Sequence, residues 1–391
     1  MTAAKTAHTL LIANPSSDVY GSDLQMLETV TAMTEAGWRV VVSTPDDGPL
    51  IDLLTGRGAE VIRPRYPVLR RENASVRGMA RLIADIMRSL PVLYRTIRQV
   101  DPDVVLVNTV TLPWWLLGSR LMGRPTVGYV HEAELGDSRP VKLALNGPLV
   151  FAHRLIVISP SSLQAVTETV KRLGERSRMI FNGVPEPTGA VEGVTRREGP
   201  RRIAIVGRLS PRKGTDVALD TVGLLRAGGR DVVLEVCGTA FAGYEWFTEQ
   251  LHERATRPDL AGAVTFSGYV NPVWPVLAEA EVVLAPSLRE PFGNAVVEAQ
   301  LAQRPVVAAA EMGHLVSVQD GETGLLVPAG DAAAAAAAVA RLLDDPAEAD
   351  RIAATARRRA LERFSVERYR AEVVELMTEV RSLGRRRRRR R

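Results

Sequence analysis

Short apolar runs alternate with helical patterns along the first half of the chain. The first run, "HTLLIAN" at 8–14, leads through a loop into "SDLQMLETVTAMTEAG", whose apolar spacing and closing Gly37 predict a helix. A long helical segment is predicted at 75–99, and the further strand-like runs are "WRVVVST", "AEVIRP", "PDVVLVN", "PTVGYVH" and "RLIVIS". This alternation predicts a mostly parallel sheet with helices on both faces.

The periodic pattern stops at 185–200, where "PEPTGAVEGVTRREGP" is rich in proline, glycine and charge and is typical of a linker. The order then restarts with "RRIAIVG", a glycine-containing loop and the helical "TDVALDTVGLLRAGG", followed by more short strand-like runs. We therefore predict an α/β protein with similar domains at 1–184 and 201–365. Open α/β sheets bind ligands at the carboxyl ends of their strands, so two of them are expected to face each other across a cleft.

The last part of the chain is predicted to be helical and then disordered. The alanine-rich "DAAAAAAAVARLLDD" suits a surface helix, and Asp331 can cap its N-terminus. Residues 366–384 show apolar positions at helical spacing. The seven arginines at 385–391 repel one another, so we expect this tail to be disordered.

Composition narrows the possible classes of function. The net charge is +5, and removing the seven terminal arginines leaves 5 − 7 = −2, so the predicted fold itself is almost neutral. A folded nucleic-acid-binding domain carries its basic residues on the fold, and we expect no nucleic-acid partner. No apolar run approaches the ~18 residues of a membrane span, and no signal peptide is evident at the N-terminus. The single cysteine, Cys237, fits a reducing cytoplasm and a buried, inert thiol.

The loop "VGRLSPRKGTD" at 206–216 carries the first candidate chemistry. A strand ends at Gly207, and Lys213 precedes a helix that Thr215 or Asp216 can cap. Backbone amides at a helix start favour an anion, and Arg208 and Lys213 add full charges suited to a diphosphate. Taken alone, the loop fits a solvated basic turn equally well.

A second candidate is "REPFGNAVVEA" at 289–299, a break between a strand and a helix that Asn294 can cap. The helix start offers amides of Gly293, Asn294 and Ala295 to a negative group. Glu298 lies one turn into the helix and Glu290 lies in the loop, and both can accept hydrogen bonds from sugar hydroxyls. Acid/base catalysis and solvated surface charges are the alternatives for the two glutamates.

Together with "NGV" at 182–184, these two segments resemble the GT4 family of retaining glycosyltransferases, and the resemblance covers nearly the whole chain. It implies the two-domain GT-B fold, a nucleotide-sugar donor and a glycan or lipid-linked acceptor, in bacterial envelope polysaccharide or glycolipid synthesis. It also implies that the helix at 366–384 returns toward the N-terminal domain.

Site roles follow from the same resemblance. Arg208 and Lys213 match the pair that neutralises the donor diphosphate, Glu298 matches the ribose-binding glutamate, and Glu290 matches the glutamate that contacts the transferred sugar. The turn whose amides approach phosphate and sugar corresponds to Phe292, Gly293, Asn294 and Ala295. We expect the base to be read by backbone around Gly268, Tyr269 and Val270.

In the N-terminal half, "YVHEAE" places His131 at a strand end, where the family has its sugar-facing histidine. Gly21 matches the family's early glycine loop, which closes on the donor. Many members have a Gly-Gly pair followed by Glu there, whereas this chain has Gly21-Ser22-Asp23. Ser22 can still present its amide to the donor, and contacts at Asp23 are the less certain ones.

No metal or cofactor is expected. Asp101 and Asp103 in "DPD" precede a strand, so a helix-to-strand turn is predicted, not a DxD metal site. Five histidines and one cysteine show no zinc-ligand spacing, and neither strand–helix opening carries Gly-x-Gly-x-x-Gly.

The segment Arg63–Arg98 is rich in arginine, and we expect it and Arg385–Arg391 to lie against anionic lipid headgroups, which would give access to a lipid-linked acceptor. A solvated helix and an incidental tail are the alternatives. For the whole protein, two other functions remain open: a nucleotide-sugar epimerase of the same architecture, and a non-catalytic module that binds nucleotide sugars or lipid surfaces.

Overall fold

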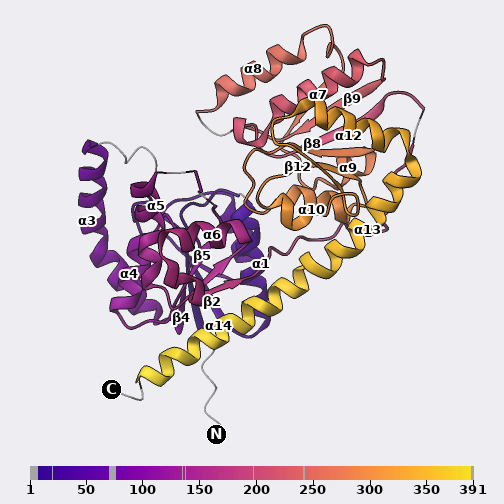
Figure 1. Ribbon diagram of the computed structural model, residues 1–391. Helices are drawn as coiled ribbons and strands as arrows, with labels where there is room; N and C mark the ends of the chain where they lie inside the picture. The colour runs from indigo at the N-terminus through magenta and orange to yellow at the C-terminus, as the bar shows by residue number, and fades with distance from the viewer. Residues whose placement is uncertain are drawn as a thin grey trace. The chain divides into compact units, whose positions relative to one another are not determined.

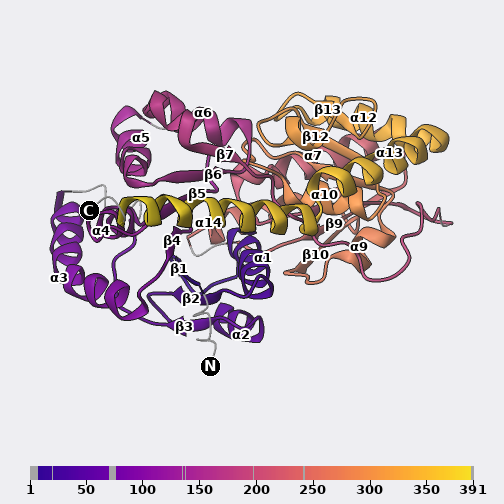
Figure 2. The same cartoon turned by 90° about the horizontal axis from the view of Figure 1, so that it is seen from below.

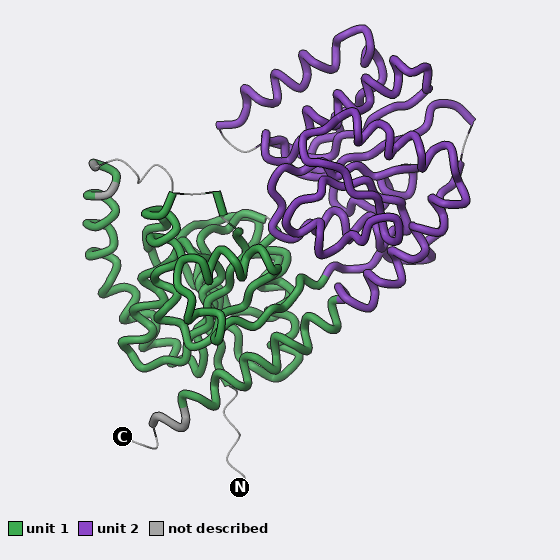
Figure 3. Tube along the Cα trace, in the orientation of Figure 1, with its two compact units in different colours: residues 1–183, 366–391 green, residues 184–365 purple. Residues whose placement is uncertain are grey.

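The computed structural model describes residues 8–19, 21–69, 76–133, 135–136, 138–196, 198–240 and 243–388. Two compact units make up the chain, which Figure 3 shows in two colours. Unit 1 contains Met1–Gly183 together with Val366–Arg391, and unit 2 contains Val184–Ser365. The segment predicted as a linker forms no helix or strand over its described residues.

Unit 1 is built on a sheet of seven parallel strands in the order β3-β2-β1-β4-β5-β6-β7. Every residue of β1, β4 and β5 is buried, as expected when helices cover both faces of a parallel sheet. The bounds are β1 Thr9–Ala13, β2 Arg39–Ser43, β3 Glu60–Ile62, β4 Val104–Val107, β5 Thr126–Val130, β6 Arg154–Val157 and β7 Ser177–Met179.

The helices of unit 1 are drawn in Figure 1 and, from below, in Figure 2. Side chains of a strand alternate between faces, and Leu11 and Val105 pack with Leu93 and Trp115 of two helices on one face. Tyr129 lies on the other face, toward the last helix of the chain. The bounds are α1 Gly21–Glu35, α2 Leu50–Gly56, α3 Val76–Val100, α4 Pro113–Leu121, α5 Arg139–Asn146, η2 Gly147–Phe151, α6 Pro160–Thr169, η3 Lys171–Arg176 and α14 Val366–Arg388.

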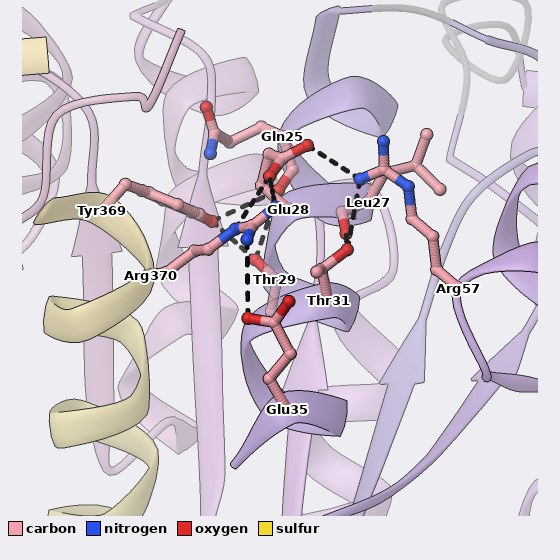
Figure 4. A network of polar contacts seen from close by, with 9 residues as sticks. All are labelled: Gln25, Leu27, Glu28, Thr29, Thr31, Glu35, Arg57, Tyr369 and Arg370. Carbon is pink, nitrogen blue, oxygen red and sulfur yellow. Dashed lines mark hydrogen bonds and ion pairs between the residues drawn. The ribbon is translucent and has the colours of Figure 1, made fainter. Parts of the chain in front are cut away.

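The C-terminal helix α14 is joined to α1 by a buried polar network, drawn in Figure 4. The hydroxyl of Tyr369 lies 2.5 Å from Oγ1 of Thr29 and accepts a hydrogen bond from Tyr129 at 3.2 Å. Beside it, Arg370 donates to the carboxylate of Glu28 at 2.6 and 3.0 Å. These contacts make α14 part of unit 1.

Helix α14 is longer than predicted. It continues through Arg388, so four of the seven arginines assigned to a disordered tail are helical, and the last three lie outside the described residues. Arginine is a strong helix former, and propagating an existing helix costs much less than nucleating one.

Unit 2 is built on six parallel strands in the order β10-β9-β8-β11-β12-β13. Its core packs on both faces of the sheet, and Asp331 accepts from the backbone N of Ala334 at 2.8 Å, the predicted cap of the alanine-rich helix. The strands are β8 Arg201–Val206, β9 Val232–Cys237, β10 Val264–Gly268, β11 Val282–Ala285, β12 Val306–Ala309 and β13 Leu325–Val327. The helices are η4 Pro211–Lys213, α7 Thr215–Ala227, α8 Glu245–Ala255, α9 Trp274–Glu279, α10 Asn294–Leu301, α11 His314–Ser317, α12 Ala332–Asp344 and α13 Pro346–Phe364.

Each sheet reverses its strand order at one place, and such a switch point is where open α/β sheets bind ligands. In unit 2 the chain builds outward from β8 through β9 to β10 and then returns to place β11 on the other side of β8. In unit 1 the corresponding strands are β1 and β4. Among the helices of the described residues, none has the length and apolar character needed to cross a bilayer.

Candidate active site

The two loops that follow β8 and β11 contain most of the predicted donor residues, and they lie at the switch point of unit 2. The first loop runs from Gly207 to Gly214 and the second from Pro286 to Gly293. The backbone N of Leu288 donates to the carbonyl of Arg212 at 2.8 Å, which ties the loops together. The structure therefore brings the segments 207–214 and 286–293 side by side, although the second follows the first by about 80 residues.

Glycines allow close backbone packing at the ends of the first three strands. Gly207 donates to Cys237, and Gly238 donates to the carbonyl of Gly268 at 2.7 Å. A Cβ on Gly238 would lie 1.8 Å from the carbonyl oxygen of Gly207, so only glycine fits. Gly268 thus lies at this edge of the sheet, and the side chain of Tyr269 after it is 63% exposed.

The start of α7 is also formed by a glycine. Gly214 has a φ of 69° and is the N-cap residue of α7, whereas Thr215 or Asp216 was predicted in that place. A Cβ on Gly214 would lie 2.4 Å from the carbonyl oxygen of Pro286 in the second loop. The close approach of the two loops therefore requires glycine, and this packing decides where the helix begins.

Two residues with separate predicted roles contact each other directly. Nζ of Lys213 forms an ion pair with Oε2 of Glu290, and both side chains are mostly buried. Burial alone would raise the pKa of Glu290, but the Lys213 ammonium outweighs it and holds that pKa below its ordinary value. The ion pair thus keeps the Glu290 carboxylate charged at the switch point.

The loop Glu290–Gly293 packs against the backbone of Gly313, a residue that sequence analysis did not single out. Gly313 donates to the carbonyl of Glu290 at 2.7 Å, and a Cβ on Gly313 would lie 2.5 Å from the backbone N of Phe292. Phe292 is buried and its ring meets Phe364 edge to face. The side chain of Phe292 thus fixes the turn by packing into the interior of unit 2.

Helix α10 begins at Asn294, with Gly293 as its N-cap at a φ of 94°. The prediction that Asn294 caps this helix is therefore wrong, because the left-handed conformation that the turn needs favours glycine. The backbone amides at the start of this helix, including that of Ala295, lie at the switch point.

His314 is a site residue that sequence analysis missed. It is 1% exposed, its Nδ1 lies 3.0 Å from the carbonyl oxygen of Ala309, and its Cδ2 would meet a Cβ on Gly293 at 2.9 Å. Burial lowers its pKa, although the Glu290 carboxylate acts in the opposite direction. The sequence signal that could have identified His314 is its position shortly after strand β12, in "EMGHL", which places it at the same edge of the sheet.

A cavity of about 20 Å³ opens between these groups. It is lined by residues of both loops, of the first turn of α10 and of the start of α11, among them Gly207, Lys213, Glu290, Gly293, Ala295 and His314. Arg208 is partly buried in the first loop.

Glu298 lies one turn into α10, as predicted, and the residue is half-buried. Burial raises the pKa of Glu298 to about 7, and the positive charge of Lys213 lowers it only in part. A carboxyl group with this pKa changes its protonation state around neutral pH. A hydrogen-bond donor brought to it stabilises the ionised form.

In unit 1 the predicted residues gather at the switch point between β1 and β4. His131 follows β5, its ring stacks on Tyr129 with centroids 4.0 Å apart, and its Nε2 lies 3.0 Å from Oδ1 of Asn108. Burial lowers the pKa of His131 to about 3. Gly21 and Ser22 form the first turn of α1, whereas Asp23 turns inward and is 2% exposed.

The acidic pair "DPD" has the structural role that was predicted. Oδ2 of Asp103 accepts from the backbone N of Thr9 at 3.0 Å, and Asp101 pairs with Arg124 at the turn between α3 and β4. Among the residues that the structure describes, no group of three or more His, Cys, Asp or Glu side chains is arranged to hold a metal ion. Burial raises the pKa of Cys237 to about 11, in agreement with an inert thiol.

Two sequence-family models match the chain, one in each half. The model described as "Glycosyltransferase Family 4" matches residues 20–186, and the model described as "Glycosyl transferases group 1" matches residues 200–345. The first includes the His131 site of unit 1, and the second includes both loops at the switch point of unit 2.

Similar proteins of known name are also glycosyltransferases. Glycogen synthase of Mycobacterium tuberculosis is 29% identical over 286 residues, which are 69% of this chain and 67% of that protein. The lipopolysaccharide core biosynthesis glycosyltransferase LpsE of Rhizobium meliloti is 27% identical over 334 residues, 81% of this chain and 90% of LpsE.

Among solved structures, Anabaena HepE in complex with UDP and glucose has the same fold, with a TM-score of 0.79 at 22% identity, over 95% of this chain and 100% of that one. Since the two family models together span most of the chain and the fold is that of the GT-B enzymes, this protein belongs to the GT4-like glycosyltransferases.

Proposed function

We propose that this enzyme is a retaining glycosyltransferase that moves a sugar from a nucleotide-sugar donor to a glycan or lipid-linked acceptor in bacterial envelope polysaccharide or glycolipid synthesis. The Lys213–Glu290 pair carries the proposal, because it places a cation for phosphate and a carboxylate for sugar hydroxyls at the switch point of unit 2. The UDP and glucose in the HepE complex and the pathway in the name of LpsE support it.

In the proposed reaction the donor separates this ion pair. The diphosphate takes the place of Glu290 as the partner of Lys213, and the released carboxylate accepts hydrogen bonds from the sugar. Arg208 and the amide of Ala295 at the start of α10 add positive charge, and the hydroxyls of the ribose donate to Glu298. His131 in unit 1 binds the transferred sugar, and the amides of Gly21 and Ser22 approach the donor.

The chemical step is then electrostatic. The bond between the anomeric carbon and the phosphate oxygen breaks, and its electron pair stays on the diphosphate, where Lys213 and Arg208 stabilise the charge. An acceptor hydroxyl forms the new bond on the same face of the sugar and passes its proton to the leaving phosphate oxygen. We propose that no metal takes part, because the cationic side chains and the helix amides supply the positive charge.

The proposed function predicts release of nucleoside diphosphate that depends on an acceptor. We expect purified protein given UDP-glucose, followed by other nucleotide sugars, to release diphosphate faster when a glycan or glycolipid extract is added, at the same rate in EDTA. An epimerase would convert the donor without an acceptor, and a binding module would shift the melting temperature without turnover. Either outcome would overturn the proposed transfer, and inhibition by EDTA would overturn the metal-free part.

We also propose that unit 1 lies on an anionic membrane surface through α3. Its exposed apolar residues Ile83, Met87, Leu90 and Tyr94 recur at spacings of four, three and four, which forms one stripe along the helix. Exposed arginines accompany the stripe, namely Arg77, Arg81, Arg88, Arg95 and Arg98. The proposed surface is therefore smaller than the predicted segment Arg63–Arg98 and is confined to α3. Arg63 is left out because it forms an ion pair with Asp47. Apolar side chains with arginines beside them suit an anionic headgroup layer.

This surface predicts binding to vesicles that contain phosphatidylglycerol. Replacing Ile83 and Met87 together with glutamine is expected to lower co-sedimentation by about tenfold or more, because each side chain loses roughly 1.5 kcal/mol of apolar burial. Leu224→Gln, at an exposed leucine on α7 of unit 2, serves as the control. A chain lacking 385–391 tests the arginine tail separately. Unchanged binding of the α3 variant would contradict this role of α3.

A further inference from the structure

A chain of hydrogen bonds links a buried carboxylate in α1 to the ring of His131. Nδ2 of Asn14 donates to Oδ1 of Asp23 at 2.8 Å, and Nδ2 of Asn108 donates to Oδ1 of Asn14 at 2.8 Å. Oδ1 of Asn108 lies 3.0 Å from Nε2 of His131. Asp23, Asn14 and Asn108 are each 2% exposed or less. The chain crosses the ends of β1, β4 and β5, at the switch point of unit 1.

The donors and acceptors of these side chains allow the hydrogen bonds to run in one direction only, from His131 toward Asp23. A carboxylate can only accept, so Asn14 must turn its NH₂ group toward Asp23. The same NH₂ group also donates to the carbonyl of Ser16 at 2.9 Å, which leaves Oδ1 of Asn14 as the group that faces Asn108. Asn108 must then donate with its NH₂ group and present its own Oδ1 to the histidine.

At the end of the chain, only a protonated Nε2 can satisfy Oδ1 of Asn108. His131 stays neutral around physiological pH because burial lowers its pKa to about 3, so its single ring proton must lie on Nε2. The other ring nitrogen, Nδ1, then carries a lone pair. The carboxylate nearest in sequence, Glu132, accepts from the backbone N of His131 at 3.0 Å.

We propose that Asp23, acting through Asn14 and Asn108, holds His131 as the neutral Nε2–H tautomer, so that its Nδ1 accepts a hydrogen bond from a hydroxyl of the transferred sugar. This rests on the proposed function, in which His131 contacts that sugar. Asp23 is then a positioning residue that sets which atom of the histidine is the acceptor. This tautomer selects the class of sugar. A sugar hydroxyl can donate to the lone pair on Nδ1 of His131, whereas a sugar carboxylate in the same place would be repelled by that lone pair.

The tautomer can be read directly by ¹⁵N NMR on the full chain labelled at histidine. The His131 signals are assigned by their loss in His131→Gln, and we expect the Nε2–H pattern from about pH 5 to about pH 9. Asp23→Asn removes the charged acceptor of the Asn14 amide and leaves the Ser16 carbonyl as the group that orients it, so a minor Nδ1–H population should appear. The kcat/KM is expected to fall by about tenfold, which corresponds to ~1.4 kcal/mol. Asp52→Asn, an exposed carboxylate of α2, is expected to change neither.

An Nδ1–H tautomer in the unmodified protein, or an unchanged histidine spectrum in Asp23→Asn, would overturn the inference. If Asp23→Asn does not fold, Asn108→Asp gives an independent reading, because a carboxylate against Nε2 should raise the pKa of His131 measured by NMR. An unchanged pKa there would also overturn it. The tautomer is measured without any donor, so a failure of sugar transfer with the expected tautomer counts against the proposed function alone.

Discussion

Replacing Lys213 with alanine is expected to lower kcat/KM by about 10²- to 10³-fold, the range typical of losing one group that stabilises charge in the transition state. The same change leaves the Glu290 carboxylate mostly buried without its cation. Removing one partner of such a pair destabilises a protein by about 3 kcal/mol, so a lower melting temperature is expected as well. Initial rates of diphosphate release and thermal unfolding measure the two effects.

The double variant Lys213→Ala with Glu290→Gln separates these two effects. It contains no unpaired carboxylate, so it should regain most of the stability while its turnover stays low. Arg212→Ala is the matched control, because Arg212 is the neighbouring cation of the same loop but is exposed. Its turnover should change by only a few fold. Recovery of turnover in the double variant would remove the diphosphate assignment of Lys213.

Glu298→Gln is expected to make the protein more stable at pH 8 and a poorer binder of its donor. In the folded protein the pKa of Glu298 is raised from 4.5 to about 7. The folded state therefore holds a proton that the unfolded state has released, and stability falls as the pH rises through this window. The shift corresponds to about 3 kcal/mol, which the neutral amide does not lose. A urea unfolding series across the window measures the slope in both proteins.

The substitution that stabilises the protein should also weaken its binding of the donor. Ribose hydroxyls donate to the Glu298 carboxylate in the proposed complex, so binding favours its ionised form and releases a proton around neutral pH. Titration calorimetry in buffers of different ionisation enthalpy detects this proton, and Glu298→Gln should abolish it and weaken binding by about tenfold. Glu249→Gln, exposed on α8, is the control. The ribose role is contradicted if Glu298→Gln binds the donor as tightly as the unmodified protein.

Most of the fold was predictable because it depends on local patterns. Alternating apolar runs and helical periods indicated two parallel sheets, and the break predicted at 185–200 lies next to the boundary between Gly183 and Val184 that separates the units. The loops that hold Lys213 and Glu290 were also predictable, since charged residues directly after buried strands come together at the carboxyl edge of a parallel sheet.

Features that depend on contacts between distant segments were not predictable. Gly214 begins α7 because Pro286 of another loop leaves no room for a Cβ, and sequence spacing alone favoured Thr215 or Asp216. Asn14 and Asn108 each end a strand-like run, but they are 94 positions apart and their contact arises only once β1 is paired with β4. His314 was missed for the same reason, because its contact with Gly293 arises only once β11 and β12 are paired.

The membership of α14 in unit 1 has a consequence for how the protein is made. A ribosome releases the seven strands of unit 1 first, but the helix that covers Tyr129 and Thr29 is synthesised only after all of unit 2. Unit 2 has its whole sequence before unit 1 does and is able to fold while the earlier unit still exposes an apolar face. We expect this unfinished face to need protection by a chaperone during synthesis.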